Sequence, residues 1–185
     1  MTRRKEPALG DALDMLVRDW ARLGAGFSAP EAEEAPDLER TLLQTARLAP
    51  SMARVFVLAI TWMTRYGDLI AIRRLGDLIR SELEPAFLPT MGLMLELAEG
   101  ERLSGHLAAL AKGLPAAAEA DPLFEVERGS PTLMERARRR ASAVSVRWGV
   151  WCEPVEVKDD ALRPRAWVLA RNPELRIRAT PLPPN

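Results

Sequence analysis

The chain has 185 residues, of which 48% are hydrophobic and 28% charged, so it is long enough to bury a core and too apolar for a disordered protein. Its one cysteine, Cys152, excludes an internal disulfide framework, and its one histidine, His106, excludes a His-rich metal site. No apolar run approaches the roughly 20 residues of a membrane span, and Asp11 and Asp14 interrupt any signal peptide. We therefore expect a cytoplasmic protein that contacts no membrane.

Helical patterns occupy the chain as far as residue 113. Apolar residues recur at helical spacing, and glycine or proline ends each pattern. Asp37 and Ser51 are expected N-caps, and the helix that follows Ser51 is apolar on nearly every face, which predicts a central core helix. A HEAT-like stacking of helix pairs stays possible. The predicted helices cover residues 8–23, 37–49, 51–66, 69–83, 89–100 and 106–112.

The remainder of the chain predicts a change of structure. A connector follows residue 115, and Ser130-Pro131 starts a helix that runs to about Ala143. Residues 144–150 then alternate apolar and polar side chains, as a strand does, and residues 167–170 and 175–179 are two further short strands. The expected fold is mainly α, a multi-helix globular body with a small C-terminal antiparallel β-sheet. We expect an N-terminal helix and acidic linker over 1–36, a helical core over 37–115, and a C-terminal region, 116–185, packed on that core as one domain.

The basic residues gather toward the C-terminus. Residues 130–185 hold eleven Arg and Lys against six Asp and Glu, although the whole chain has no net charge. In the helix that begins at Pro131, Arg136, Arg139 and Arg140 fall on one face. This stripe is suited to phosphates and to carboxylates alike. It indicates either a solvated face balanced by the acidic front of the chain, or a surface for a nucleic acid, an acidic protein or another copy of the chain.

The last segment predicts an edge hairpin. Leu175 and Ile177 would point inward while Arg176 and Arg178 point to solvent, and the prolines of residues 180–185 would block further pairing. Together the site residues that we predict for partner or nucleic-acid binding are Arg136, Arg139, Arg140, Arg176 and Arg178.

Two alternatives stay open. Residues 52–80 contain two helices joined at Tyr66-Gly67, with Arg73, Arg74 and Arg80 on the second, which allows a helix-turn-helix that binds DNA. Glu156-Val157-Lys158 matches half of a metal-dependent nuclease motif, although that motif also requires a second acid on a neighbouring strand. A Cys152–His106 nucleophile pair would have to join different structural layers.

The segment VLARNPELRIRA, residues 168–179, resembles a stretch of large bacterial regulator-like proteins in which a winged-helix DNA-binding domain follows it. The resemblance covers about a dozen residues, and prolines 181, 183 and 184 stand where that domain would begin. It implies the part of a regulator that does not itself bind DNA, and it assigns no site residues. We expect a non-catalytic bacterial regulatory or assembly protein that binds a protein partner or forms a homo-oligomer, with nucleic acid as a further possible partner, and that uses no cofactor.

Overall fold

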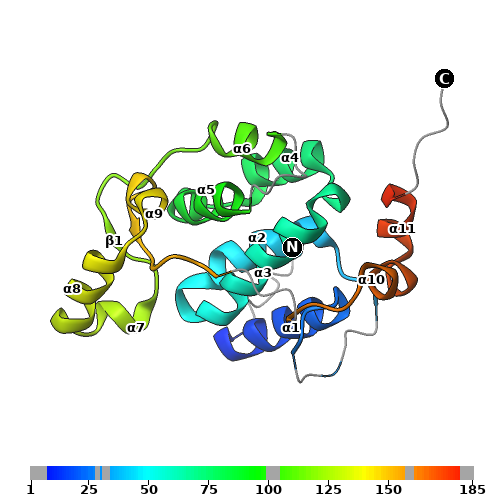
Figure 1. Ribbon diagram of the computed structural model, residues 1–185, viewed down its shortest axis with the longest axis horizontal. Coiled ribbons are helices and arrows are strands. Elements are labelled where there is room, and N and C mark those ends of the chain that lie inside the picture. Colours follow the sequence, from blue (N-terminus) through cyan, green and yellow to red (C-terminus); the bar gives the residue numbers. More distant parts are fainter. Residues whose placement is uncertain (1–7, 28–29, 31–33, 99–104, 157–160, 180–185) are drawn as a thin grey trace, which may run out of the picture.

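A computed structural model describes residues 8–27, 30, 34–98, 105–156 and 161–179. The described part of the chain is mainly helical, as expected, and the bounds of its elements follow (Figure 1). The α-helices are α1 (Leu9–Arg22), α2 (Leu38–Leu48), α3 (Ala53–Tyr66), α4 (Ile72–Glu82), α5 (Leu88–Leu97), α6 (His106–Ala111), α7 (Glu125–Arg128), α8 (Pro131–Arg140), α9 (Ala143–Arg147), α10 (Arg165–Arg171) and α11 (Pro173–Ala179), the 3-10 helices are η1 (Ala49–Ser51), η2 (Gly67–Leu69) and η3 (Pro85–Phe87), and the strands are β1 (Asp121–Pro122) and β2 (Val150–Trp151).

The body of the molecule is built from α1 to α6, with α2 and α3 in its middle. α2 packs against α1, α3, α4 and α5, and α3 also packs against α5. The prediction of a central core helix is confirmed, because nine of the fourteen residues of α3 are buried. Within the described residues, no helix is both long enough and apolar enough to cross a lipid bilayer.

Aromatic side chains with satisfied polar atoms fill the centre of the body. The Trp20 and Trp62 rings meet edge to face at 6.1 Å, and Trp62 meets Tyr66 at 5.4 Å. Trp20 Nε1 donates to Thr45 Oγ1 at 2.9 Å, and Trp62 Nε1 donates to the Leu23 carbonyl at 2.9 Å. Each indole thus keeps a hydrogen bond inside the core, so its burial leaves no donor unsatisfied.

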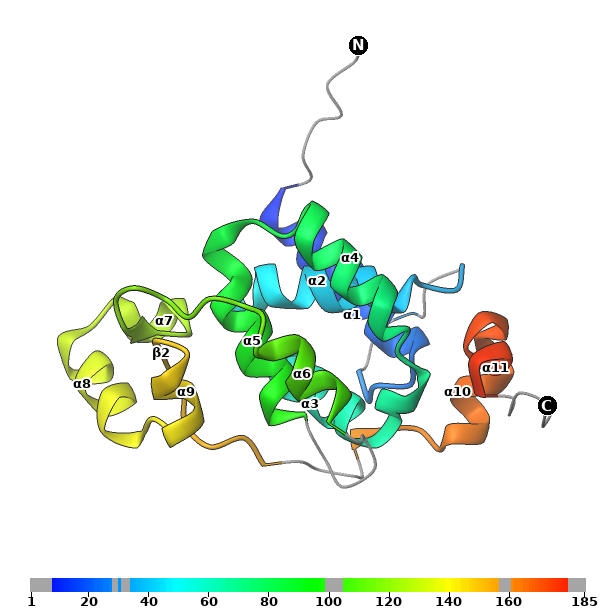
Figure 2. The same ribbon diagram turned by 90° about the horizontal axis from the view of Figure 1, so that it is seen from above.

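Two smaller units lie at the ends of the long axis of the molecule (Figures 1 and 2). One is the α8 lobe, which we define as residues 116–156 and which contains α7, α8, α9 and both strands. The other is the pair α10–α11, which packs beside η2. The two views agree that the α8 lobe projects from the body on one side only, so much of its surface faces away from the other helices.

The predicted antiparallel sheet is wrong. β1 and β2 form a two-stranded parallel ladder, with Asp121 opposite Val150 and Pro122 opposite Trp151. The strands run in the same direction because α7, α8 and α9 carry the chain back across the lobe before β2 begins. An isolated antiparallel bridge joins Ala25 to Leu162 elsewhere in the described chain.

The three strands predicted after residue 143 are also helices for most of their length. Residues 143–147 form α9, since the Ser142 hydroxyl accepts the Ser145 N–H at 3.1 Å as an N-cap does. Residues 167–170 lie in α10 and residues 175–179 in α11, which begins with Pro173 at its first position. The strand that does form in this region, β2, keeps only Val150 of the predicted one.

Candidate partner-binding surface

Helix α8 carries the predicted arginine stripe on the outer side of the lobe. Ser130-Pro131 opens the helix as expected, although the Ser130 side chain makes no capping hydrogen bond. Ala137 is the one buried residue of α8, so nearly all of the helix surface faces solvent or a shallow contact. The basic side chains are therefore accessible to a partner.

Three arginines of the stripe already contact carboxylates of the lobe. Arg136 Nε lies 3.6 Å and Arg140 Nη1 3.3 Å from the same Glu153 oxygen, while Arg139 Nε lies 3.2 Å from Glu135 Oε1 one turn away. The arginine side chains stay 56% to 75% exposed, so these pairs hold the side chains only weakly and a partner's anion can replace them. The lobe as a whole has six arginines and seven Asp and Glu, so it is not a basic body.

A hollow of about 370 Å³ lies beside the stripe. Its apolar surface comes from Pro131, Met134 and the half-buried Trp151. Arg128, Glu135 and Arg138 also line it, and Arg128 pairs with Asp121 at 2.8 Å. Pro131, Met134 and Arg138 follow each other at intervals of three and four, so one face of α8 forms a wall of the hollow. Arg138 forms no ion pair with another described residue.

Sequence reasoning missed this hollow. Trp151 and the turn of α8 opposite it are brought together by the parallel strand pair, which the sequence pattern did not predict. The signal that points to it is the spacing of Met134 and Arg138 on the predicted helix, but the pattern gave no reason to place an indole beside them.

Arg176 and Arg178 do not form the predicted pair of outward strand residues. Arg176 is exposed on α11, but Arg178 turns toward the body and places both nitrogens of its fork on Glu39, at 2.6 and 3.1 Å. The apolar residues also separate: Leu175 is buried, while Ile177 is 76% exposed. In a strand, residues two apart in the sequence lie on the same side, whereas in a helix they lie on different sides. Leu175 and Ile177 therefore separate because this segment is helical.

Glu39 is fully buried, yet its carboxylate is well satisfied. Besides Arg178, it accepts the Ala71 N–H at 2.9 Å and an Arg74 nitrogen at 3.4 Å. Arg178 also donates to the Leu69 carbonyl at 3.0 Å. This cluster joins α2, η2, α4 and α11, so Arg178 holds the C-terminal helix on the body and is not available to a partner.

Other arginines of the C-terminal region likewise contact acids of the front part. Arg165 makes two hydrogen bonds to Asp68, at 2.8 and 2.6 Å, and Arg147 pairs with Glu96. Part of the excess positive charge of the C-terminal region is thus neutralised by acidic residues of the same molecule.

The helices of the helix-turn-helix alternative are α3 and α4, joined through η2. α4 packs mainly against α2 and α6, and Arg74 and Arg80 contact Asp37 and Asp77. Arg73 is exposed. All three arginines are thus exposed on this helix, and two of them form ion pairs.

The motifs considered for catalysis are dispersed. Glu156 is described, whereas Val157 and Lys158 lie outside the described residues. Burial, followed by the charges of Glu127 and Glu153, raises the pKa of the Cys152 thiol to about 12. Within the ranges that the structure describes, no group of three or more His, Cys, Asp or Glu residues is arranged to hold a metal ion.

Comparison of the chain with protein-family models, with curated proteins and with solved structures finds no match.

Proposed function

We propose that the protein is a non-catalytic regulatory or assembly factor that binds an acidic segment of a protein partner through the outer side of α8. The observation that carries the proposal is the hollow at Trp151, because it combines an exposed apolar surface with the unpaired guanidinium of Arg138. Tryptophan and arginine are the residues that most often dominate binding energy at protein interfaces.

The charge of the lobe favours an acidic protein segment over a nucleic acid. Backbone recognition of DNA depends on many phosphate contacts, and the seven carboxylates of the lobe would repel a long polyanion. A short segment with one apolar anchor and one or two carboxylates needs only the hollow and its nearest arginines. Arg136, Arg139 and Arg140, which form exposed pairs, would assist such a segment at the edge of the contact.

A peptide library displayed on phage and selected on the full-length chain tests the proposal. We expect enrichment of peptides in which Asp or Glu flanks an aromatic or aliphatic residue. Arg138→Glu should abolish the selection, and Trp151→Ala should weaken it. Arg18→Glu is the matched control, since Arg18 is an exposed arginine on α1 at a distance in the fold, and it should leave binding unchanged. Enrichment of basic peptides, or equal binding by Arg138→Glu, would contradict the proposal.

Two further measurements would identify duplex DNA or a second copy of the chain as the partner. Binding of duplex with a steep salt dependence that disappears in the triple variant Arg136→Ala, Arg139→Ala, Arg140→Ala would support DNA recognition in place of a protein partner. A mass measurement that finds a stable homo-oligomer, which Arg138→Glu dissociates, would identify the acidic segment as part of this same chain.

A further inference from the structure

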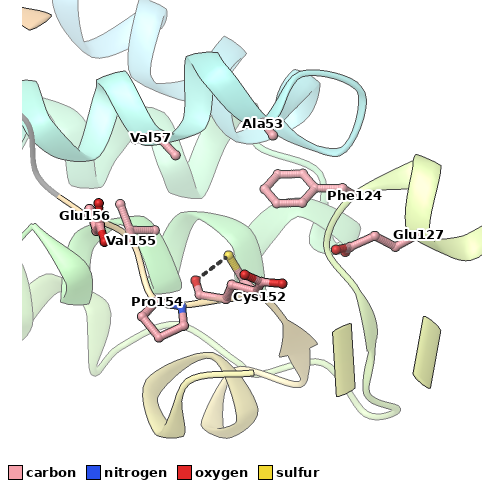
Figure 3. Close-up of a pocket in the computed structure, with 9 residues that line it drawn as sticks. Ala53, Val57, Phe124, Glu127, Cys152, Pro154, Val155 and Glu156 are labelled. Atoms are coloured by element: carbon pink, nitrogen blue, oxygen red, sulfur yellow. Dashed lines mark hydrogen bonds between the residues drawn. The ribbon is translucent and has the colours of Figure 1, made fainter. Parts of the chain in front are cut away.

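A second cavity, of about 440 Å³, lies between α3 and the inner side of the α8 lobe. Ala53 and Val57 of α3 and the ring of Phe124 line one side, and Cys152 and Pro154 line the other (Figure 3). The volume is within the range of small-molecule sites, and its residues are not those of the hollow at Trp151.

Contacts with the body hold the walls of this cavity in place. The Phe124 ring packs edge to face on Phe56 at 5.9 Å between ring centres, and Phe56 is fully buried. The Ser51 hydroxyl donates to Glu125 Oε2 at 3.0 Å, which ties the start of α7 to η1. The cavity is therefore largely formed before any ligand enters, which lowers the cost of binding.

Carboxylates lie at the two ends of the cavity, with the apolar walls between them. Figure 3 shows Glu127 beyond Phe124 at one end and Glu156 beside Val155 at the other. Glu156 is exposed and forms no ion pair with another described residue. Glu153 also lines the cavity, but Arg136 and Arg140 already contact it.

Glu127 has an unused acceptor. Its Oε2 is buried and takes no hydrogen bond. Burial, and to a lesser extent the charge of Glu153, raises the pKa of the Glu127 carboxyl, while a backbone hydrogen bond at Phe124 and the charge of Arg136 act in the opposite direction. A buried carboxylate oxygen without a donor is costly, so a cationic N–H donor at this end would supply what the protein itself does not.

We infer that this cavity binds an aliphatic dication, a hydrocarbon chain with an ammonium group at each end. Glu127 and Glu156 each take one ammonium group, and Val57, Phe124 and Pro154 cover the methylene chain between them. Because the two acids stand at opposite ends, they do not converge on a single metal ion. The site does not depend on the proposed partner surface.

Calorimetric titration of the full-length chain with cadaverine tests the inference. We expect pentylamine, which carries one ammonium group, to bind about tenfold more weakly, as the loss of one charged hydrogen bond predicts, and pentanediol not to bind. A series of longer and shorter diamines should show an optimum of chain length.

Variants identify the two ends. Glu127→Gln and Glu156→Gln should each reduce the affinity for cadaverine to that for pentylamine. Glu174→Gln, at an exposed position of α11, is the matched control and should change nothing. Because Glu156 is exposed, Glu156→Gln should not change the stability of the fold. Its effect on binding can therefore be interpreted even if Glu127→Gln destabilises the protein. Equal affinity for the monoamine and the diamine, or cadaverine binding that survives both substitutions, would overturn the inference.

Discussion

At the scale of single residues, the contact between Arg178 and Glu39 shows that a residue predicted to bind a partner has a structural role instead. The same arginine that a strand pattern turns outward is used to neutralise a fully buried carboxylate. A buried charge is tolerated only where partners satisfy it, so removal of one partner costs far more than the loss of a surface pair.

We expect Arg178→Ala to lower the free energy of unfolding by about 3 kcal/mol, because Glu39 would stay buried with only Arg74 and one backbone N–H near it. Urea unfolding measures the change, and Arg18→Ala, an exposed control, should differ from wild type by less than about 0.5 kcal/mol. The double variant Arg178→Ala, Glu39→Gln should be less destabilised than Arg178→Ala alone. Equal stability of the Arg178 and Arg18 variants would mean that the buried pair contributes nothing.

Cys152 gives a prediction on pH. Its folded pKa of about 12 is above its ordinary value near 9, so the folded state keeps a proton that the unfolded state loses. The stabilisation is fully present below about pH 9 and is lost progressively as the pH rises toward 12. The difference in stability between wild type and Cys152→Ala should therefore decrease above about pH 9, by at most about 1.4 kcal/mol per pH unit. Urea unfolding of both proteins across this range measures it, and a difference that does not change with pH would contradict the shift.

At the scale of elements, the long helices could be predicted, whereas of the short ones only α6 was. Periodicity over three turns or more, with Asp37 as a real N-cap that accepts the Arg40 N–H at 3.3 Å, located α1 to α5 within a few residues. Ser51 was a less accurate prediction, since it lies in η1 and α3 begins two residues later. Between Ala143 and Ala179 the helices have five to seven residues, too few for a period of 3.6 to be distinguished from alternation.

The site was predicted only in part for a related reason. The shared face of the α8 arginines follows from their spacing along one helix, and this spacing can be read directly from the sequence. The hollow at Trp151, the cavity with Glu127 and Glu156, and the Arg178–Glu39 contact each join segments far apart in the chain. No local pattern specifies such contacts. The wrong period at Leu175 to Arg178 placed Ile177 and Arg178 on the wrong sides, while Leu175 and Arg176 lie as predicted.

The contact of α5 with α9 depends on a glycine. A Cβ atom on Gly92 would lie 2.2 Å from Trp148 Cζ3, and the Trp148 indole cannot swing aside without breaking its 2.7 Å hydrogen bond to Glu96. We expect Gly92→Ala to lower the free energy of unfolding by about 2 kcal/mol, in spite of the better helix propensity of alanine.

Gly10 offers the matched control for that substitution. It lies in α1 with nothing near its absent Cβ, so Gly10→Ala should be neutral or stabilising by up to about 1 kcal/mol. Urea unfolding compares the two variants. If Gly92→Ala is as stable as Gly10→Ala, the α5–α9 contact is looser than the structure shows.

At the scale of the whole molecule, the body separates two outer units with different attachments. The α10–α11 pair is fixed by buried or bidentate polar contacts, including the Tyr66 hydroxyl on the Arg163 carbonyl at 2.6 Å. The α8 lobe is attached through apolar contacts, which include the Phe124 ring on Phe56 and the buried residues Leu123, Trp148, Val150 and Cys152. The unit with the proposed partner surface thus shares the apolar core of the body, whereas the α10–α11 pair depends more on polar contacts.

The C-terminal end of α1 meets the junction of α10 and α11. Arg22 of α1 donates to the Arg171 carbonyl at 3.0 Å, and the Asn172 amide donates to the Arg22 carbonyl at 3.2 Å, across about 150 residues of sequence. On the ribosome, the partners of α1 in this contact emerge about 150 residues after α1 itself. With synthesis at roughly 5 to 20 residues per second, α1 waits for several seconds or more without that contact. The apolar face of α1 packs on α2 and on Trp62 of α3, which emerge much earlier, so only the C-terminal end of α1 waits for the last hydrogen bonds of the fold.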